Sequence, residues 1–347
     1  MRSVSLGWRP AALLPLLVLL AAAACGDGDV LAVPRVPAGD GGIDASDASG
    51  PGVDGGSADA SADVSLDAGG DVFVPTDAGP AQCGNKKVRI VAGNLSSGTG
   101  QTYDAGHGIR IWKALSPDVA LIQEFKYGDN GVAAQRAFVD AAFGAEFAFV
   151  RGASANGSDI PNGIASRYPI VDSGDWVDPQ VSNRAFTWAR IDVPGPTDLY
   201  AVSVHLLTTS ASDRNAEASA LLGRLQSLPS NAFVVVGGDL NTNVRDEAAL
   251  GTLSPVLQTK GPYPADQAGN ANTSAPRSKP YDWVIGNGAL HGCARPTEIG
   301  GATFAAGLVF DTRVFSPLDA VPPATVGDSD APSMQHMAVV REFGIAD

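Results

Sequence analysis

Short runs of apolar residues, many of them β-branched, recur along the chain from residue 86 onward and predict buried β-strands. The clearest run is Phe233–Asp239, in which four apolar residues precede two glycines and a carboxylate. We expect strands over Lys86–Leu95, Asp118–Glu124, Glu146–Val150, Asn162–Ile170, Thr187–Val193, Leu199–Leu206, Phe233–Asp239, Tyr281–Ile285, Val309–Val314 and Met337–Glu342.

Apolar residues spaced by three and four positions predict helices over Ile109–Leu115, Val132–Phe143 and Asp213–Leu228. Strands therefore outnumber helices, and the helices lie between strands. This order predicts an α/β fold, a four-layer α-β-β-α sandwich with two mixed, mainly antiparallel sheets. We expect it to be one domain over residues 81–347.

The N-terminus has the pattern of an export signal. Arg2 and Arg9 precede an uncharged run rich in Leu and Ala that ends at Ala24, which predicts a signal peptide over residues 1–24. The run is too short for a comfortable membrane span. It ends in Ala22-Ala23-Ala24-Cys25, which resembles a bacterial lipobox and favours lipidation of Cys25, although Ala22 replaces the usual Leu. A plain signal peptide cut near Cys25 is the alternative.

Residues 25–80 have a different composition, dominated by Gly, Ala, Asp, Ser, Val and Pro. Residues 26–80 contain eleven Asp against Arg35 alone, a net charge of about −10 out of −14 for the whole chain. Such a segment buries too little apolar surface to fold, and it predicts a disordered tether. Arg2 and Arg9 contribute +2, so the part from Ala81 onward is near −6 and lacks the strongly basic surface of a tight nucleic-acid binder.

The chain has three cysteines, and lipid would occupy Cys25. Cys83 and Cys293 then remain in a compartment that permits disulfides. They form either a disulfide or two free thiols, because spacing alone does not fix geometry. No Cys-x-x-Cys pair is present, so the three cysteines do not indicate a zinc site.

Polar side chains suited to phosphate chemistry lie at or near the ends of several expected strands. They are Asn94, Glu124, His205, Asp239, Asn241, Asp282 and His336. Each alone has an ordinary structural explanation, such as a turn residue or a satisfied core histidine. Together they indicate an active site built at strand ends. In extended backbone Asp239 and Asn241 also point to the same side.

With these residues in this order, the chain resembles the endonuclease/exonuclease/phosphatase superfamily, whose fold is deoxyribonuclease I-like. The matching motifs lie in order from about Val88 to Val340. They are Gly93-Asn94-Leu95, Ile122-Gln123-Glu124, Ser166-Arg167-Tyr168-Pro169-Ile170, Val204-His205-Leu206, Gly237-Gly238-Asp239-Leu240-Asn241, Tyr281-Asp282-Trp283 and Gln335-His336.

The resemblance implies a divalent cation, Mg²⁺ or Mn²⁺, with Glu124 as its primary ligand and Asn94 beside it. One carboxylate and one amide are adequate for Mg²⁺, which keeps most of its waters. The family usually has Ser-Asp-His where this chain has Met334-Gln335-His336. Gln335 cannot supply the extra carboxylate, and this weakens any two-metal site. Asp328 and Asp330 lie nearby in the sequence, and either is open as a substitute.

The resemblance also implies the catalytic roles. Asp239 orients or deprotonates the attacking water, Asn241 holds the phosphate, and His205 donates to a non-bridging oxygen. His336 is the general acid or base, and Asp282 fixes its tautomer.

The sequence thus favours an extracytoplasmic divalent-metal phosphodiesterase of endonuclease type that acts on nucleic acid as a monomer held at a membrane by its lipid. A lipid-head-group phosphodiesterase or phosphatase, of sphingomyelinase or phosphoinositide type, is the alternative. That class calls for an exposed apolar hairpin, yet segment 252–276 contains one aromatic residue, Tyr263. A binding module that lost catalysis is the third hypothesis. Arg184 could reach a phosphate.

Overall fold

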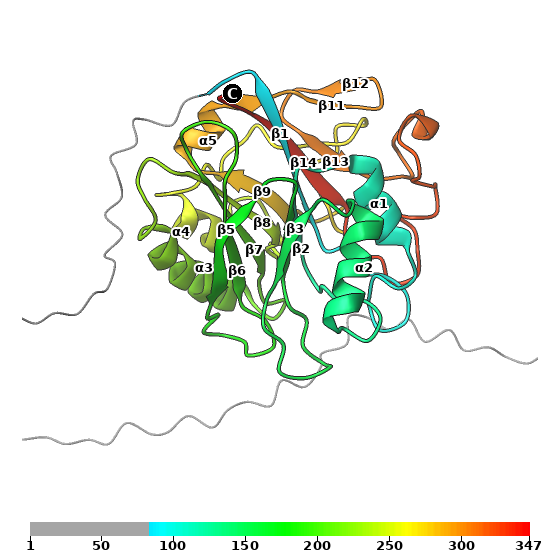
Figure 1. Cartoon of the computed structure of the whole chain (residues 1–347), viewed down its shortest axis with the longest axis horizontal. Coiled ribbons are helices and arrows are strands. Elements are labelled where there is room, and N and C mark those ends of the chain that lie inside the picture. Colours follow the sequence, from blue (N-terminus) through cyan, green and yellow to red (C-terminus); the bar gives the residue numbers. More distant parts are fainter. Residues whose placement is uncertain (1–82) are drawn as a thin grey trace, which may run out of the picture. The chain divides into compact units, whose positions relative to one another are not determined.

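Two β-sheets packed face to face form the centre of the domain (Figure 1), in a computed structural model that describes residues 83–347. The fold class expected from the sequence is therefore confirmed. The expected signal peptide, the lipidated Cys25 and the tether lie outside the described residues, and so does the domain boundary at residue 81.

The first sheet is mixed and has seven strands. In spatial order they are β10 (Ala294–Arg295), β14 (Ala338–Ile345), β1 (Lys86–Gly93), β2 (Val119–Ile122), β4 (Gly163–Ser166) and β3 (Ala148–Arg151), with β13 (Leu308–Phe310) also paired to β14. Only β1 and β2 run parallel; the other pairs are antiparallel.

The second sheet has five strands in sequence order. They are β5 (Ile170–Trp176), β6 (Phe186–Ile191), β7 (Leu199–His205), β8 (Phe233–Asp239) and β9 (Asp282–Gly286). Here β7 and β8 are the parallel pair. A separate hairpin joins β11 (Thr297–Ile299) to β12 (Ala302–Phe304).

Helices cover the outer faces of both sheets. The first sheet buries its outer face against α1 (His107–Leu115) and α2 (Val132–Ala142), and the second against α3 (Ala211–Leu225) and α4 (Ala248–Leu253). The short α5 (Gly288–Gly292) follows β9, and a 3₁₀ turn spans Leu318–Ala320. Apolar side chains from β1, β2, β8, β9 and β14 fill the layer between the sheets. None of the helices among residues 83–347 is long and apolar enough to cross a bilayer.

Two expected strands differ from the structure. The strand predicted over Asn162–Ile170 ends at Ser166, where a turn through Pro169 leads into the separate strand β5. The strand predicted over Val309–Val314 ends at Phe310. The next residue, Asp311, turns away because its buried carboxylate binds the guanidinium groups of Arg277 and Arg313.

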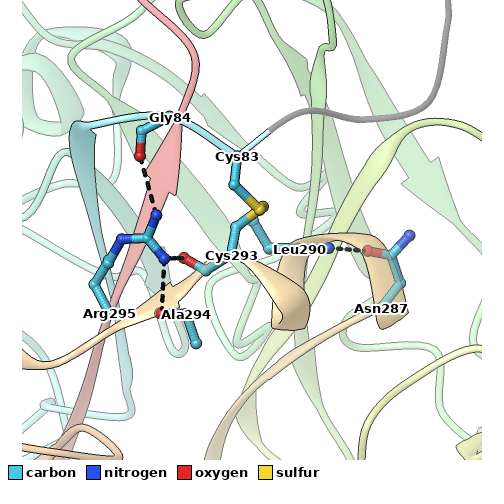
Figure 2. The surroundings of a disulfide bond; sticks show 7 residues. All are labelled: Cys83, Gly84, Asn287, Leu290, Cys293, Ala294 and Arg295. Carbon is cyan, nitrogen blue, oxygen red and sulfur yellow. Dashed lines mark hydrogen bonds between the residues drawn. A yellow bond between two sulfur atoms is a disulfide. The ribbon is translucent and has the colours of Figure 1, made fainter.

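Cys83 and Cys293 form a disulfide that joins the start of the described chain to the end of α5 (Figure 2), with their Cα atoms 5.1 Å apart. Arg295 reinforces this junction, because its guanidinium donates to the backbone oxygens of Gly84, Cys293 and Ala294. Cys83 precedes β1, whereas Asn94 follows it. The disulfide therefore lies at the opposite end of this strand from Asn94.

Candidate active site

The polar residues predicted from the sequence meet at one edge of the sandwich. The strand ends that carry them lie on the same side in both sheets. In the second sheet, His205 at the end of β7 pairs with Asp239 at the end of β8, and Asp239 pairs with Asp282 at the start of β9. In the first sheet, β1 and β2 run parallel into Asn94 and Glu124. The antiparallel β14 begins two residues after His336.

Asn94 and Glu124 are hydrogen-bonded to each other beneath the surface. The Asn94 amide donates to Glu124 Oε1 over 2.9 Å, and the two side chains are 2 and 7% exposed. Ser96 donates to both, over 2.8 Å to Glu124 Oε2 and 3.1 Å to Asn94 Oδ1. The backbone N–H of Asn94 donates to Asp282 Oδ1, which links this pair to the second sheet. The carboxylate of Glu124 is thus held in place before any ligand arrives.

Two glycines let the sheets approach closely under the site. A Cβ on Gly237 would lie 2.6 Å from Leu121 Cδ1, and one on Gly238 would lie 2.5 Å from Gln123 Nε2. In the space so created, Gln123 donates to Ser203 Oγ, which donates to the Ile122 carbonyl. The Gly237-Gly238 pair therefore allows the two sheets to pack closely directly below the side chains of the candidate site.

His336 lies between two carboxylates. Its Nδ1 is 2.9 Å from Asp282 Oδ2, and its Nε2 is 3.4 Å from Asp239 Oδ2. Burial by itself would lower the pKa of His336, but Asp239 and Asp282 outweigh it and raise this pKa to about 10. The imidazole is consequently a cation at neutral pH, with a proton on Nε2 that faces Asp239.

Asp239 is 1% exposed, and both active-site histidines face it. Its Oδ2 lies 3.3 Å from His205 Nε2 as well as near His336, while Oδ1 accepts the backbone N–H of Asn241. Burial raises the pKa of Asp239 to about 7; His336 opposes this shift and Asp282 adds to it. A carboxyl group that titrates near neutral pH is suited to exchanging a proton with water.

His205 is a neutral imidazole. Burial lowers its pKa well below the usual range, and the nearby Arg184 and His336 cations lower it further. Its Nδ1 is buried and has no hydrogen-bond partner among the described residues. Arg184 is buried and its Nε donates to the His205 carbonyl oxygen. Arg184 thus supports the end of β7 and lies beside the residues predicted for the site.

Comparison with known proteins agrees with this geometry. Residues 101–304, more than half of the chain, match the Endonuclease/Exonuclease/phosphatase family. The chain belongs to this family. Its members are phosphoric ester hydrolases that depend on divalent metal, so the protein is an enzyme of this class. No curated protein matches the chain.

Solved structures of the endonuclease/exonuclease/phosphatase fold resemble the chain at low sequence identity. The endonuclease/exonuclease/phosphatase from Beutenbergia cavernae DSM 12333 is 16% identical with a TM-score of 0.50, covering 76% of this chain and 72% of its own. The protein of that name from Bacteroides vulgatus is 13% identical with a TM-score of 0.51, covering 75 and 100%. TDP2 from D. rerio, complexed with a single-stranded DNA product, is 17% identical with a TM-score of 0.51, covering 75 and 100%. These similarities describe the fold alone.

A divalent cation fits the charge and chemistry of this endonuclease/exonuclease/phosphatase site. Glu124, Asp239 and Asp282 are three buried carboxylates, and the negative charges of Glu124 and Asp282 help to raise the pKa of Asp239. A cation would offset that repulsion, and oxygen donors are the ligands that Mg²⁺ and Mn²⁺ prefer. Ligand atoms of Asp239, Asp282 and His336 lie within 4.8 Å of one another. The His336 nitrogens already face two carboxylates, however, so oxygen atoms are the more suitable ligands for a metal here.

Two residues left open by the sequence do not replace the family's missing aspartate. Asp328 is fully buried and forms an ion pair with Arg110, and Asp330 is exposed near Arg313. Sequence reasoning also missed Ser96 and Gln123, which hold Glu124 and the sheet contact in place. Ser96 could have been found from its position two residues after Asn94, which places it on the same side of the chain.

Proposed function

We propose that this hydrolase is a divalent-metal-dependent phosphodiesterase that cleaves nucleic acid outside the cytoplasm. The observation that carries the chemistry is the buried Asp282–His336 pair, with His336 Nε2 aimed at Asp239 Oδ2. This arrangement places a proton donor and a proton acceptor side by side at the edge where Glu124 also lies.

Each side chain has a defined part in the reaction. Asp239 accepts a proton from the attacking water or orients it, because its pKa lies near neutrality. His336 donates a proton from its Nε2 to the oxygen that leaves as the P–O bond breaks, and Asp282 keeps His336 charged and correctly oriented. The neutral His205 donates to a non-bridging phosphoryl oxygen.

Asn241 positions the phosphate. Its Nδ2 donates to the Leu206 carbonyl over 2.9 Å, which leaves the second amide hydrogen for a ligand. Its φ of +50° is uncommon for a residue other than glycine, and Glu124 shares this conformation with a φ of +49°. Such conformations cluster at functional sites, where the surrounding structure imposes them.

Glu124 and the oxygen of Asn94 would hold a divalent cation, which when bound would polarise a phosphoryl oxygen and offset negative charge in the transition state. The hydrogen bonds from Ser96 and Asn94 fix the Glu124 carboxylate for that purpose.

Nucleic acid is the substrate class that the surface favours over a lipid layer. The large apolar side chains exposed among residues 83–347 are all valines. Tyr263, the aromatic residue of segment 252–276, packs against Trp283 and under the Arg245 guanidinium. Lys126 and Lys279 lie within three residues of Glu124 and Asp282 and can meet backbone phosphates. TDP2 of the same fold binds a DNA product.

Hydrolysis assays on the purified chain test this proposal. Plasmid DNA, RNA, bis(p-nitrophenyl) phosphate and sphingomyelin are offered in parallel with Mg²⁺, Mn²⁺ or EDTA. We expect cleavage of nucleic acid that EDTA abolishes and that His336→Ala lowers about 10²–10⁴-fold. Turnover of sphingomyelin alone would replace the proposal with a lipid-head-group phosphodiesterase. Nucleic-acid binding without hydrolysis of any substrate would indicate a binding module.

We further propose that the chain is exported and anchored to a membrane by lipid on Cys25, either in the periplasm or at the cell surface. The Cys83–Cys293 disulfide supports export, because disulfides persist in oxidising compartments. In cell fractionation we expect the intact chain in the membrane fraction and Cys25→Ser in the soluble fraction. Membrane association of both proteins would contradict a lipid anchor on this residue.

A further inference from the structure

A pocket beside the active-site cluster opens between the outer edge of β9 and strands β13 and β14. Segment 258–264 contributes to its wall. Its polar and aromatic lining includes Arg245, Lys260, Tyr263, Trp283 and Arg341. Asp282 also borders it, but its Oδ1 and Oδ2 are bonded to the Asn94 N–H and to His336. The pocket is therefore basic in a domain whose overall charge is negative.

Arg341 occupies a position where an apolar residue is expected. Side chains along a strand alternate between faces, so Val339, Arg341 and Phe343 share one face of β14. Val339 and Phe343 belong to the apolar layer between the two sheets. Arg341 is 7% exposed, so a guanidinium group is buried within that layer.

Neither arginine of the pocket has an acidic partner. Arg341 reaches the Val284 carbonyl over 3.5 Å and the Phe343 ring over 5.4 Å. Arg245 donates to the Ala271 carbonyl and lies over the rings of Tyr263 and Trp283. No carboxylate of residues 83–347 forms an ion pair with either guanidinium. Burial lowers the pKa of both residues.

A buried cation without a counterion is costly, and proteins ordinarily pair such groups. The inner space that a water-sized group can occupy is about 20 Å³. That volume has room for about one water-sized group, such as a single small ion. We propose that this pocket binds a single chloride-sized anion through Arg245 and Arg341.

The bound anion would act on the active site through two strands. Trp283 and Val284 on β9 follow Asp282, and Arg341 on β14 follows His336 by five residues. An anion that joins Arg341 of β14 to the wall formed by β9 stabilises the strands that bring Asp282 and His336 together. The inference concerns binding and does not depend on the proposed nuclease activity.

Thermal unfolding in matched sodium salts tests the anion site. Chloride and bromide are compared with gluconate, which is too large for the pocket, at the same ionic strength. We expect Tm to rise saturably by about 3–6 °C in chloride once it reaches roughly ten times its Kd. In crystals grown in bromide, we expect an anomalous peak beside Arg245 and Arg341.

Arg341→Met and Arg245→Met separate anion binding from a purely structural role. Both variants should lose the difference in Tm between chloride and gluconate. Arg151→Met is the matched control, because Arg151 is also half-buried with a pKa lowered by burial but lies elsewhere, and it should keep the difference. Equal Tm values in the two salts, with no bromide in the pocket of the wild-type crystal, would overturn the proposal.

Discussion

Asp239 is the side chain that lies between the two histidines of the candidate site. One of its oxygens faces both His205 and His336, and the other accepts the N–H of Asn241. Its neighbours differ in charge, since His336 is cationic and His205 neutral. The surroundings therefore shift the pKa values of these two histidines in opposite directions, which suits the different roles proposed for them.

A second buried carboxyl group, Glu217 on α3, lies near the strand end that carries His205. It accepts the backbone N–H of Leu207 over 2.9 Å and is fully buried. Burial raises the pKa of Glu217 to about 9, and the Asp178 carboxylate contributes to this shift. The folded protein therefore holds a proton here that the unfolded chain releases above its ordinary pKa of about 4.5.

We predict from this that stability falls as pH rises from about 4.5 to about 9, because the folded state binds more protons there. Glu217→Gln stays neutral and keeps an oxygen acceptor for Leu207. Its free energy of unfolding should fall less steeply with pH than that of the wild type, by up to about 1.4 kcal/mol per pH unit. Urea unfolding at pH 5, 7 and 8.5 measures this. The exposed Glu146→Gln should follow the wild type, and parallel curves for all three proteins would refute the assignment.

At the scale of elements, the β7–β8 pair and its close contact with β2 position the side chains of the candidate site. Gly238 has a φ of +131°, and a Cβ there would lie 2.2 Å from the Val204 carbonyl oxygen and 2.5 Å from Gln123 Nε2. A side chain at this position must push the strands or the sheets apart.

Gly238→Ala should consequently lower the free energy of unfolding by about 3 kcal/mol or more. Gly223→Ala is a suitable control, because Gly223 lies in α3 and nothing is within 4 Å of the added Cβ. That substitution should stabilise the protein by about 0.5–1 kcal/mol. Urea midpoints compare the two, and equal effects would show that the sheets tolerate separation.

Burial explains why the sequence predicted strand β8 and missed strand β5. Strand β8 is buried at every position and was expected to the residue. Strand β5, with the sequence IVDSGDW, is mostly exposed or half-exposed at the edge of its sheet, so it carries no continuous apolar signal. Strand ends identified Glu124 and Asp239, but the register that places His205, Asp239 and Asp282 side by side depends on strand order. Only the folded sheets supply that order.

At the scale of the whole molecule, the Cys83–Cys293 disulfide closes a loop of 210 residues. It constrains the unfolded chain, and its removal by Cys83→Ser with Cys293→Ala should cost about 2–5 kcal/mol. The urea midpoint of the double variant is compared with that of the wild type under non-reducing conditions. Cys25→Ser leaves this pair intact and should unfold like the wild type. An unchanged midpoint in the double variant would show that the bond adds nothing to stability.

The same disulfide determines where a mechanical load enters the domain. A force applied at Cys83 would, without the bond, pull directly on β1, which lies between β14 and β2. With the bond, the force divides between β1 and the α5–β10 segment, and the contacts of Arg295 with Gly84 share it. The functional edge lies at the far end of β1, eight residues or roughly 26 Å away. A force applied at Cys83 would therefore enter the domain at the end of β1 opposite the candidate site.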